Sequence, residues 1–426
     1  MRKHLALIAV LLTAVFGAHA QTGTWSGKIE VQGMKLPLVF HLNEENPTMD
    51  SPDQGARGIP IVVERDDTTG KITIKISSIG ATYEGQWTSE EIVGTFRQWG
   101  TSLPLTLVPG EEKVNRPQTP KAPFPYTTEE VSFTNGDAVL KGTLVLPAGY
   151  TKKTPVLIMV TGSGLQNRDE EIFEHKPFAV IADALARAGI ATLRYDDRGF
   201  GESTGDIINF TTEDLKNDAF SGIRLLRERF DKVGVIGHSE GGTIALLLAA
   251  EGKADFIVSL AGNVVSGAET LLWQNRIALS GAGVPAETVD TYCKALAEAF
   301  ETGVAGNYDL PEGLKQNLSM AIMQLQTPYL KYFLKLDTRP VLGKITCPVL
   351  ALNGSKDQQV NPDANLEAIR KGLPAVAPAQ IECMEGLNHL FQPCTTGATT
   401  EYKEIEVTIA PEVLAKLVEW LSAISA

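Results

Sequence analysis

Basic residues, histidines and cysteines are scarce in this chain of 426 residues. Lys and Arg number 38 against 51 Asp and Glu, which gives a formal net charge of −13. This excess of acidic side chains disfavours nucleic acids and anionic membrane surfaces as partners. The four cysteines show no spacing typical of metal ligands. We therefore expect neither a metal nor an organic cofactor.

Long apolar runs are also absent beyond the first residues, so the sequence predicts no membrane-spanning helix. Near its start the chain has Arg2 and Lys3, an apolar run from Leu5 to Phe16, and an Ala18-His19-Ala20 motif. This order is typical of a removable signal peptide, here residues 1–20. We expect the mature protein to be exported, either to the periplasm or out of the cell.

The chain length favours two or three domains, and the residue pattern divides accordingly. Residues 21–109 alternate apolar and polar positions with a period of two, which predicts a small all-β domain, a barrel or a sandwich. Residues 110–125 hold four prolines and several charges, the composition of a semi-rigid linker. No titratable residues cluster in the β domain, so we assign it no chemistry.

Strand and helix patterns alternate over residues 126–426, which predicts a mostly parallel sheet of eight strands with helices on both faces. The strands are expected at 129–134, 140–146, 155–161, 191–196, 232–238, 255–260, 347–353 and 379–384, and the helices at 178–188, 214–229, 242–250, 363–371 and 411–425. Helical periodicity without strand signals fills residues 263–344. Such an insertion predicts a helical cap over the site.

Gly237-His238-Ser239-Glu240-Gly241 is the most informative motif. Residues 232–236 before it indicate a buried strand, and the residues from Gly242 onward indicate a helix. A strand, a sharp turn with Gly-x-Ser-x-Gly and a helix form a nucleophile elbow, which exposes a serine oxygen at the end of a sheet. Both glycines are required because the turn leaves no room for a Cβ on either side. Ser239 is the predicted nucleophile.

A serine hydroxyl needs a base within hydrogen-bond reach and a third group that orients the base. Of the six histidines, His389 directly follows the last expected strand and is the predicted base. Asp357 follows the seventh strand and its turn and is the predicted acid. Asp363 is the alternative acid, although it is also suited to cap the next helix. Serine, aspartate and histidine follow one another in the chain order of α/β-hydrolases.

Acyl transfer also requires two hydrogen-bond donors for the developing oxyanion. The backbone N–H of Glu240, next to the nucleophile and at a helix start, is one. The other is expected from Ser163 or Gly164 in the small-residue loop after the third strand. The charged segments 165–170 and 194–199 could bind substrate, but ion pairs that hold the loops are the more common role. We assign the Glu240 carboxylate no role.

The cysteines leave one structural alternative open. Cys383 and Cys394 bracket the segment around His389. In an exported protein a disulfide between them would stiffen that segment. Two free thiols agree with the sequence equally well.

Several motifs together resemble exported bacterial α/β-hydrolases related to the esterase D type carboxylesterases, a group also associated with serine aminopeptidase-like hydrolases. The motifs are Gly162-Ser163-Gly164 with Arg168-Asp169-Glu170, His175-Lys176-Pro177-Phe178, Arg194 to Gly199, Gly237 to Gly242, and Asn388-His389-Leu390-Phe391-Gln392. The resemblance covers residues 126–426 and implies an α/β-hydrolase fold with a triad of Ser239, Asp357 and His389. Asn167 stands where we expect the family to have an acidic residue, which argues against a charge-based substrate role for its loop.

The sequence thus favours a serine carboxylesterase that cleaves small esters with short acyl chains through an acyl-enzyme. A serine peptidase or aminopeptidase is the nearest alternative, and it would need cap carboxylates aimed at a substrate amine. The cap offers Glu269, Glu287, Asp290, Glu298 and Glu301. A non-catalytic binding protein on a hydrolase scaffold is the alternative from another class. The oligomeric state is not predicted.

Overall fold

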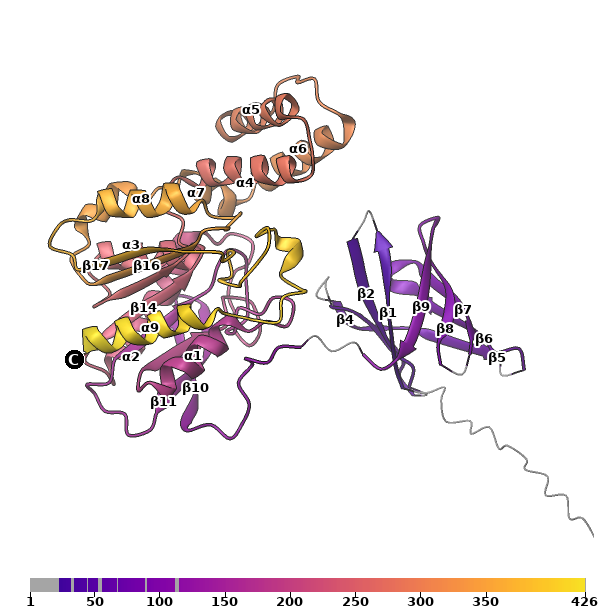
Figure 1. The fold of residues 1–426 in the computed structure, drawn as a ribbon, viewed down its shortest axis with the longest axis horizontal. Coiled ribbons are helices and arrows are strands. Elements are labelled where there is room, and N and C mark those ends of the chain that lie inside the picture. Colours follow the sequence, from indigo (N-terminus) through magenta and orange to yellow (C-terminus); the bar gives the residue numbers. More distant parts are fainter. Residues whose placement is uncertain are drawn as a thin grey trace, which may run out of the picture. The chain divides into compact units, whose positions relative to one another are not determined.

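The computed structural model describes residues 23–31, 34–43, 45–52, 56–66, 68–88, 90–111 and 115–425. Residues 1–20, the predicted signal peptide, lie outside this range. The chain divides into two units, Met1–Lys113 and Val114–Ala426 (Figure 1). The division falls within residues 110–125, which the sequence predicts as a linker.

The first unit is a nine-stranded antiparallel sheet in the order β4-β3-β2-β1-β9-β8-β7-β6-β5. Its strands are β1 (Thr24–Val31), β2 (Met34–His41), β3 (Thr48–Ser51), β4 (Ala56–Pro60), β5 (Val62–Asp66), β6 (Lys71–Ile76), β7 (Ala81–Trp87), β8 (Ile92–Gln98) and β9 (Thr101–Pro109). Tyr83 lies fully buried in its core and donates to the carbonyl oxygens of Ile92 (2.9 Å) and Leu105 (3.1 Å). The all-β fold predicted for this region is confirmed.

The second unit is built on an eight-stranded sheet in the order β10-β11-β13-β12-β14-β15-β16-β17. The strands are β10 (Tyr126–Asn135), β11 (Ala138–Pro147), β12 (Val156–Val160), β13 (Ala191–Tyr195), β14 (Val233–His238), β15 (Ile257–Leu260), β16 (Val349–Gly354) and β17 (Ala379–Met384). The first two pairings, β10 with β11 and β11 with β13, are antiparallel, and the others are parallel. The mostly parallel sheet predicted from the alternating pattern is confirmed.

Helices cover both faces of this sheet (Figure 1). One apolar layer includes α1 (Pro177–Arg187) and α9 (Pro411–Ser425), which pack on each other as well as on the sheet. The opposite layer includes α2 (Thr212–Arg227), α3 (Glu240–Ala250) and α8 (Pro362–Gly372). The five strands from β12 to β16 are buried along their whole length or nearly so, as parallel strands between two helix layers must be.

The insertion after β15 is helical, as the sequence predicts. It contains α4 (Gly267–Gly281), α5 (Ala286–Thr302), α6 (Glu312–Gln324) and α7 (Pro328–Lys335), and is followed by a 3-10 helix, η3 (Arg339–Lys344). Helices α4, α5 and α6 share a small apolar core of their own. Helix α7 packs against α4 within the cap and against α2 of the main unit.

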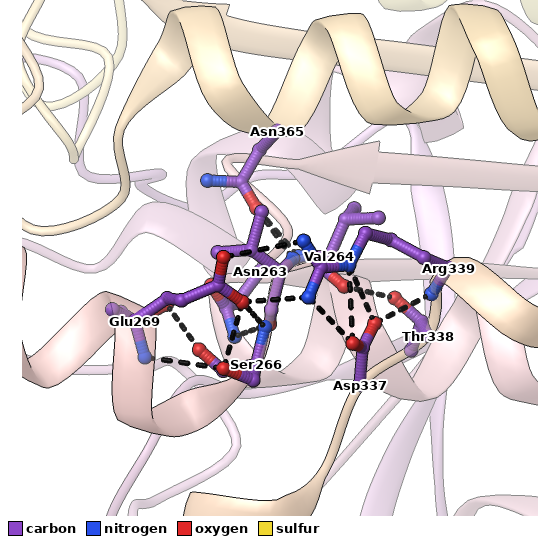
Figure 2. A network of polar contacts seen from close by, with 10 residues as sticks. Asn263, Val264, Ser266, Glu269, Asp337, Thr338, Arg339 and Asn365 are labelled. Atoms are coloured by element: carbon purple, nitrogen blue, oxygen red, sulfur yellow. Dashed lines mark hydrogen bonds and ion pairs between the residues drawn. The ribbon is translucent and has the colours of Figure 1, made fainter.

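The two ends of this cap are joined by a network of polar contacts at its base (Figure 2). The carbonyl oxygen of Val264, where the chain enters the cap, accepts from the backbone N–H (3.1 Å) and the hydroxyl (2.9 Å) of Thr338, where the chain leaves it. Asn365 of α8 accepts from Val264 N–H at 2.6 Å. Arg339 binds Glu269 in the first turn of α4. The cap is therefore closed at its base and fastened to α8.

Part of the predicted linker lies against the second unit. Arg116 is 8% exposed and donates to the carbonyl oxygens of Phe173 (2.9 Å), Lys403 (2.8 Å) and Ile405 (2.8 Å). Burial of this guanidinium lowers its pKa, while nearby glutamates raise it. The buried side chain thus fixes the start of the second unit to two loops of that unit.

Two further findings concern predictions from composition. None of the helices in the described ranges is long and apolar enough to cross a membrane. All four cysteines are free thiols, with Cys383 exposed and Cys394 partly buried. Of the two alternatives for these residues, the structure has the free thiols.

Candidate active site

Ser239 lies at the turn between β14 and α3, in a backbone conformation that residues other than glycine rarely adopt. Its φ and ψ angles are 54° and −117°. A Cβ on Gly237 would lie 2.0 Å from the carbonyl oxygen of Gly241, and one on Gly241 would lie 2.0 Å from that of Val160. Both glycines are therefore required by close backbone approach. This strained turn has the form of a nucleophile elbow.

His389 and Asp357 meet at the ends of the last two strands. Asp357 follows β16, and its Oδ2 lies 2.7 Å from Nδ1 of His389 in the loop after β17. The other carboxylate oxygen accepts from the backbone N–H groups of Gln359 (2.7 Å) and Val360 (2.9 Å). Both side chains are almost fully buried. Asp363 instead lies in the first turn of α8, so Asp357 is the carboxylate that contacts the histidine.

The loop that carries His389 is fixed by its own side chains. The Oδ1 of Asn388 accepts from the backbone N–H groups of Leu390 (3.0 Å) and Gln392 (2.9 Å). The amide group of Asn388 donates to the side chain of Gln392 at 3.0 Å. Phe391 has a left-handed φ of 60°. These contacts hold the histidine in one orientation relative to the sheet.

The expected oxyanion donors come from two segments beside Ser239, namely the start of α3 and the loop after β12. Glu240 begins α3, so its N–H lies at the positive end of the helix dipole. Gly162 approaches the nucleophile so closely that a Cβ there would lie 3.2 Å from Cβ of Ser239. Ser163 and Gly164 follow in the same loop, and interactions with both lower the pKa of the Tyr329 hydroxyl on cap helix α7, although burial leaves that pKa raised. The structure thus brings the three predicted donors close to one cap side chain.

The Glu240 side chain, to which the sequence analysis assigned no role, connects the elbow to the cap. It is 1% exposed, and its carboxylate accepts from the hydroxyl of Thr212 at 2.5 Å and from that of Tyr329. Burial raises the pKa of Glu240, partly opposed by these hydroxyl donors. Burial beside this carboxyl also raises the pKa of Tyr329. No sequence signal distinguishes Tyr329 from the other cap aromatics.

A second histidine–carboxylate pair lies next to the first. Nδ1 of His238 is 2.9 Å from Oε1 of Glu170, and Nε2 is 2.9 Å from the carbonyl oxygen of His389. The same Glu170 oxygen accepts from the Gly162 N–H at 2.8 Å. The rings of His238 and His389 are 4.6 Å apart between centroids. The sequence places Glu170 in a charged loop, but no local pattern predicts this pairing.

Ion pairs hold the charged loops around these residues. Arg168 binds Asp196 at 2.8 Å, as well as Glu130 and Glu202, and Arg194 binds Asp169. The loops therefore neutralise one another's charges, and these ion pairs have the structural role of holding the loops in place.

Asp197 is buried in the same group of loops. It accepts hydrogen bonds from the Thr161 hydroxyl and the Gln166 N–H, both at 2.8 Å. Burial raises the pKa of Asp197 to about 8. This carboxyl supports the start of the loop that carries Ser163 and Gly164.

Within the described residues, no group of His, Cys, Asp and Glu side chains has the arrangement of a metal site.

Comparisons with known proteins identify a family and a curated relative. Residues 157–394 match the alpha/beta hydrolase family. The chain is 29% identical over 274 residues to the esterase EstD of Thermotoga maritima, an alignment that covers 63% of this chain and 61% of that relative. The chain thus matches about three fifths of the relative's length.

The solved structures that match this chain include those of a peptidase and an esterase. The proline iminopeptidase of Mycobacterium smegmatis is 17% identical with a TM-score of 0.46, over 70% of this chain and 99% of that one. The esterase Pf2001 of Pyrococcus furiosus is 16% identical with a TM-score of 0.44, over 74% of this chain and 98% of that one.

The range that matches the family begins in β12 and ends beyond His389. It includes the elbow, Asp357 and the cap, and it is more than half of the chain. The fold predicted from the strand and helix pattern is therefore confirmed, and the chain belongs to the alpha/beta hydrolase family.

Proposed function

We propose that this protein is a serine carboxylesterase that cleaves small esters, with Ser239, His389 and Asp357 as its catalytic triad. The observation that carries the proposal is the 2.7 Å contact between His389 Nδ1 and Asp357. It lies in the same site as Ser239, whose backbone is strained at the nucleophile elbow. The similarity to a protein named as an esterase supports the choice of substrate class.

In the proposed reaction, the Ser239 oxygen forms a bond to the ester carbonyl carbon while Nε2 of His389 takes the hydroxyl proton. Asp357 holds the other ring nitrogen and stabilises the imidazolium. The N–H of Glu240 and one from Ser163 or Gly164 bind the oxyanion. As the carbon–oxygen bond to the alcohol breaks, the alcohol leaves with the proton from His389. Water then attacks the acyl-enzyme with His389 again as base, which releases the acid and restores Ser239.

The proposal includes a preference for short acyl chains. The Tyr329 hydroxyl on the cap donates to the carboxylate of Glu240, the residue whose backbone N–H is proposed to bind the carbonyl oxygen. Its ring packs with Phe210 (5.2 Å between centroids) and Phe333 (6.3 Å). Bulky groups close to the carbonyl carbon would therefore meet this aromatic cluster.

The cap carboxylates give little support to an aminopeptidase. Glu269 binds Arg339, Asp290 binds Arg276 at 2.5 Å, and Glu298 accepts from Tyr308 at 2.6 Å. Three of the five acidic residues considered are thus engaged within the cap and its base. We also propose export of the mature chain, on the strength of the signal-peptide pattern in residues 1–20.

The test is hydrolysis of p-nitrophenyl acetate, butyrate and octanoate by the mature chain, with Ser239→Ala beside it. Ser319→Ala, on the exposed surface of α6, is the matched control. We expect turnover of the shorter esters, abolished by Ser239→Ala and unchanged in the control. Turnover of aminoacyl p-nitroanilides instead would favour the peptidase. Absence of any turnover and of labelling by a fluorophosphonate would favour the binding protein.

A further inference from the structure

The Glu170–His238 pair joins three segments of the site. Glu170 lies in the loop after β12, His238 ends β14 next to Ser239, and the His389 carbonyl belongs to the loop after β17. Glu170 and His238 are 4% and 6% exposed. The triad proposed above uses neither side chain. A buried, charged pair beside a nucleophile therefore remains without a function.

Hydrogen-bond chemistry specifies the charge state of His238. A backbone carbonyl oxygen can only accept, so Nε2 must donate to His389 O. An ionised carboxylate can also only accept, so Nδ1 must donate to Glu170. A histidine that donates from both ring nitrogens is an imidazolium. With Glu170 ionised, the contacts to Glu170 and to the His389 carbonyl thus specify a cation at this position.

The surrounding charges agree with this assignment. The titratable groups that face His238 are Glu170, His389 and Asp357. Burial by itself lowers the pKa of His238, but the Glu170 charge, the two hydrogen bonds and the more distant Asp357 outweigh it and leave the pKa raised. Both carboxylates therefore stabilise the one buried cation.

We propose that His238 is a lasting imidazolium which, with Glu170, positions the loop of the catalytic base and the oxyanion loop relative to each other. The inference rests on the proposed esterase function. His238 fixes the backbone of His389, while Glu170 fixes the Gly162 N–H beside Ser239. Glu170 has a left-handed φ of 53°, a strained conformation that a non-glycine residue keeps only when its surroundings hold it. Both residues act through their neighbours, as positioning residues.

The charge state can be measured directly in the wild-type protein. Selective ¹⁵N labelling of histidine and NMR at pH 8 would report how many ring protons each histidine carries. We expect His238, assigned by the loss of its signals in His238→Gln, to show two N–H protons and imidazolium nitrogen shifts. A single ring proton on His238 at this pH would overturn the proposal. This readout does not depend on any enzymatic activity.

The positioning role is tested with Glu170→Gln, which keeps the shape and removes the charge. Once His238 is neutral, the new amide either accepts from Nδ1, which leaves the Nε2 lone pair facing the His389 carbonyl, or donates to Nδ1, which gives up the contact with the Gly162 N–H, so one contact is lost in either case. We expect kcat on p-nitrophenyl butyrate to fall by roughly tenfold to a hundredfold with KM nearly unchanged, as for small misplacements of catalytic groups. We also expect a new loss of kcat on the alkaline side, where His238 loses its proton.

Glu171→Gln is the matched control, because Glu171 lies in the same loop but contacts Asn167 and Lys176. It should retain wild-type kcat and the wild-type pH profile. Wild-type kcat and pH profile in folded Glu170→Gln would overturn the positioning role. If wild-type protein cleaves no ester, the proposed function fails, whereas the NMR result still decides the charge state of His238.

Discussion

Two histidine–carboxylate pairs lie side by side in this molecule, and they differ in what the second ring nitrogen contacts. His389 is bonded to Asp357 through Nδ1, and the described residues provide no hydrogen-bond partner for its Nε2. His238 is bonded to Glu170 through Nδ1, and its Nε2 is occupied by a backbone carbonyl. The first arrangement suits a ring that exchanges a proton with substrate. The second suits a ring that keeps both of its protons.

A histidine paired with a carboxylate can therefore have either of two roles. Both histidines are buried and both have a carboxylate partner within 3 Å. The difference lies at Nε2. Where an acceptor already occupies this nitrogen, it keeps its proton, and where none does, it can exchange a proton with substrate. Substitutions in each pair test the two roles separately, and His175 is a third buried histidine with which they can be compared.

Replacing Asp357 should have the largest effect. Asp357→Asn presents an amide to His389 Nδ1 and stabilises the wrong tautomer, so we expect kcat to fall by about 10³- to 10⁴-fold. The measurement is steady-state hydrolysis of p-nitrophenyl butyrate, with Asp363→Asn as the control that should stay near wild type. A larger loss in Glu170→Gln than in Asp357→Asn would reverse the roles assigned to the two pairs.

The Glu170–His238 pair should contribute more to the stability of the folded protein than the Asp357–His389 pair does. His238→Leu leaves the buried Glu170 carboxylate without its cation, and we expect the free energy of unfolding to fall by about 3–5 kcal/mol in urea denaturation. The double variant with Glu170→Gln should be more stable than His238→Leu alone, because the unpaired charge is gone. Simple additivity of the two substitutions would show that the residues are not coupled.

The third histidine, His175, is held in the opposite charge state. It is fully buried, with Nδ1 2.8 Å from the Thr408 hydroxyl and Nε2 3.0 Å from the Tyr402 carbonyl oxygen. Burial lowers the pKa of His175 to about 4. Because the folded state then binds fewer protons than the unfolded state, its stabilising contribution is present above pH 6.5 and is lost as pH falls toward 4.

This contribution amounts to roughly 3 kcal/mol over that range. We expect unfolding in urea, measured at several pH values, to show a smaller decrease of stability between pH 6.5 and 4 in His175→Gln than in the wild type. An unchanged slope in the variant would show that another group is responsible.

Removing the Tyr329 hydroxyl should have the smallest effect. Tyr329→Phe keeps the ring in its aromatic cluster but removes one donor from the buried Glu240 carboxyl. We expect a loss of about 1–2 kcal/mol in the free energy of unfolding and a modest change in kcat/KM. Tyr332→Phe, which removes the hydroxyl bonded to the partly exposed Glu213, is the control and should change neither. A loss of activity as large as that of Asp357→Asn would give Tyr329 a catalytic role.

Sequence patterns predicted the fold and singled out the residues of the proposed triad, because both depend on local order along the chain. Buried strands and amphipathic helices alternate, and Ser239, Asp357 and His389 each follow a strand directly. Glu170 and His238 are 68 residues apart, and Glu240 and Tyr329 are 89 apart. Their contacts depend on which loops the completed sheet brings together, and no local pattern specifies that. The docking of Arg116 on two distant loops was missed for the same reason.

The base of the cap has a consequence for how this scaffold can be altered (Figure 2). Val264 and Thr338 are 74 residues apart in sequence, yet a single carbonyl oxygen accepts two hydrogen bonds across the gap. Since the ends of the insertion already meet, a segment of different length can be grafted between them without moving β15 or β16. Asn365 of α8 would still fix the graft point. We therefore expect that an exchanged cap would leave the register of β15 and β16 unchanged, as long as it also supplies a donor to the buried Glu240 carboxyl in place of Tyr329.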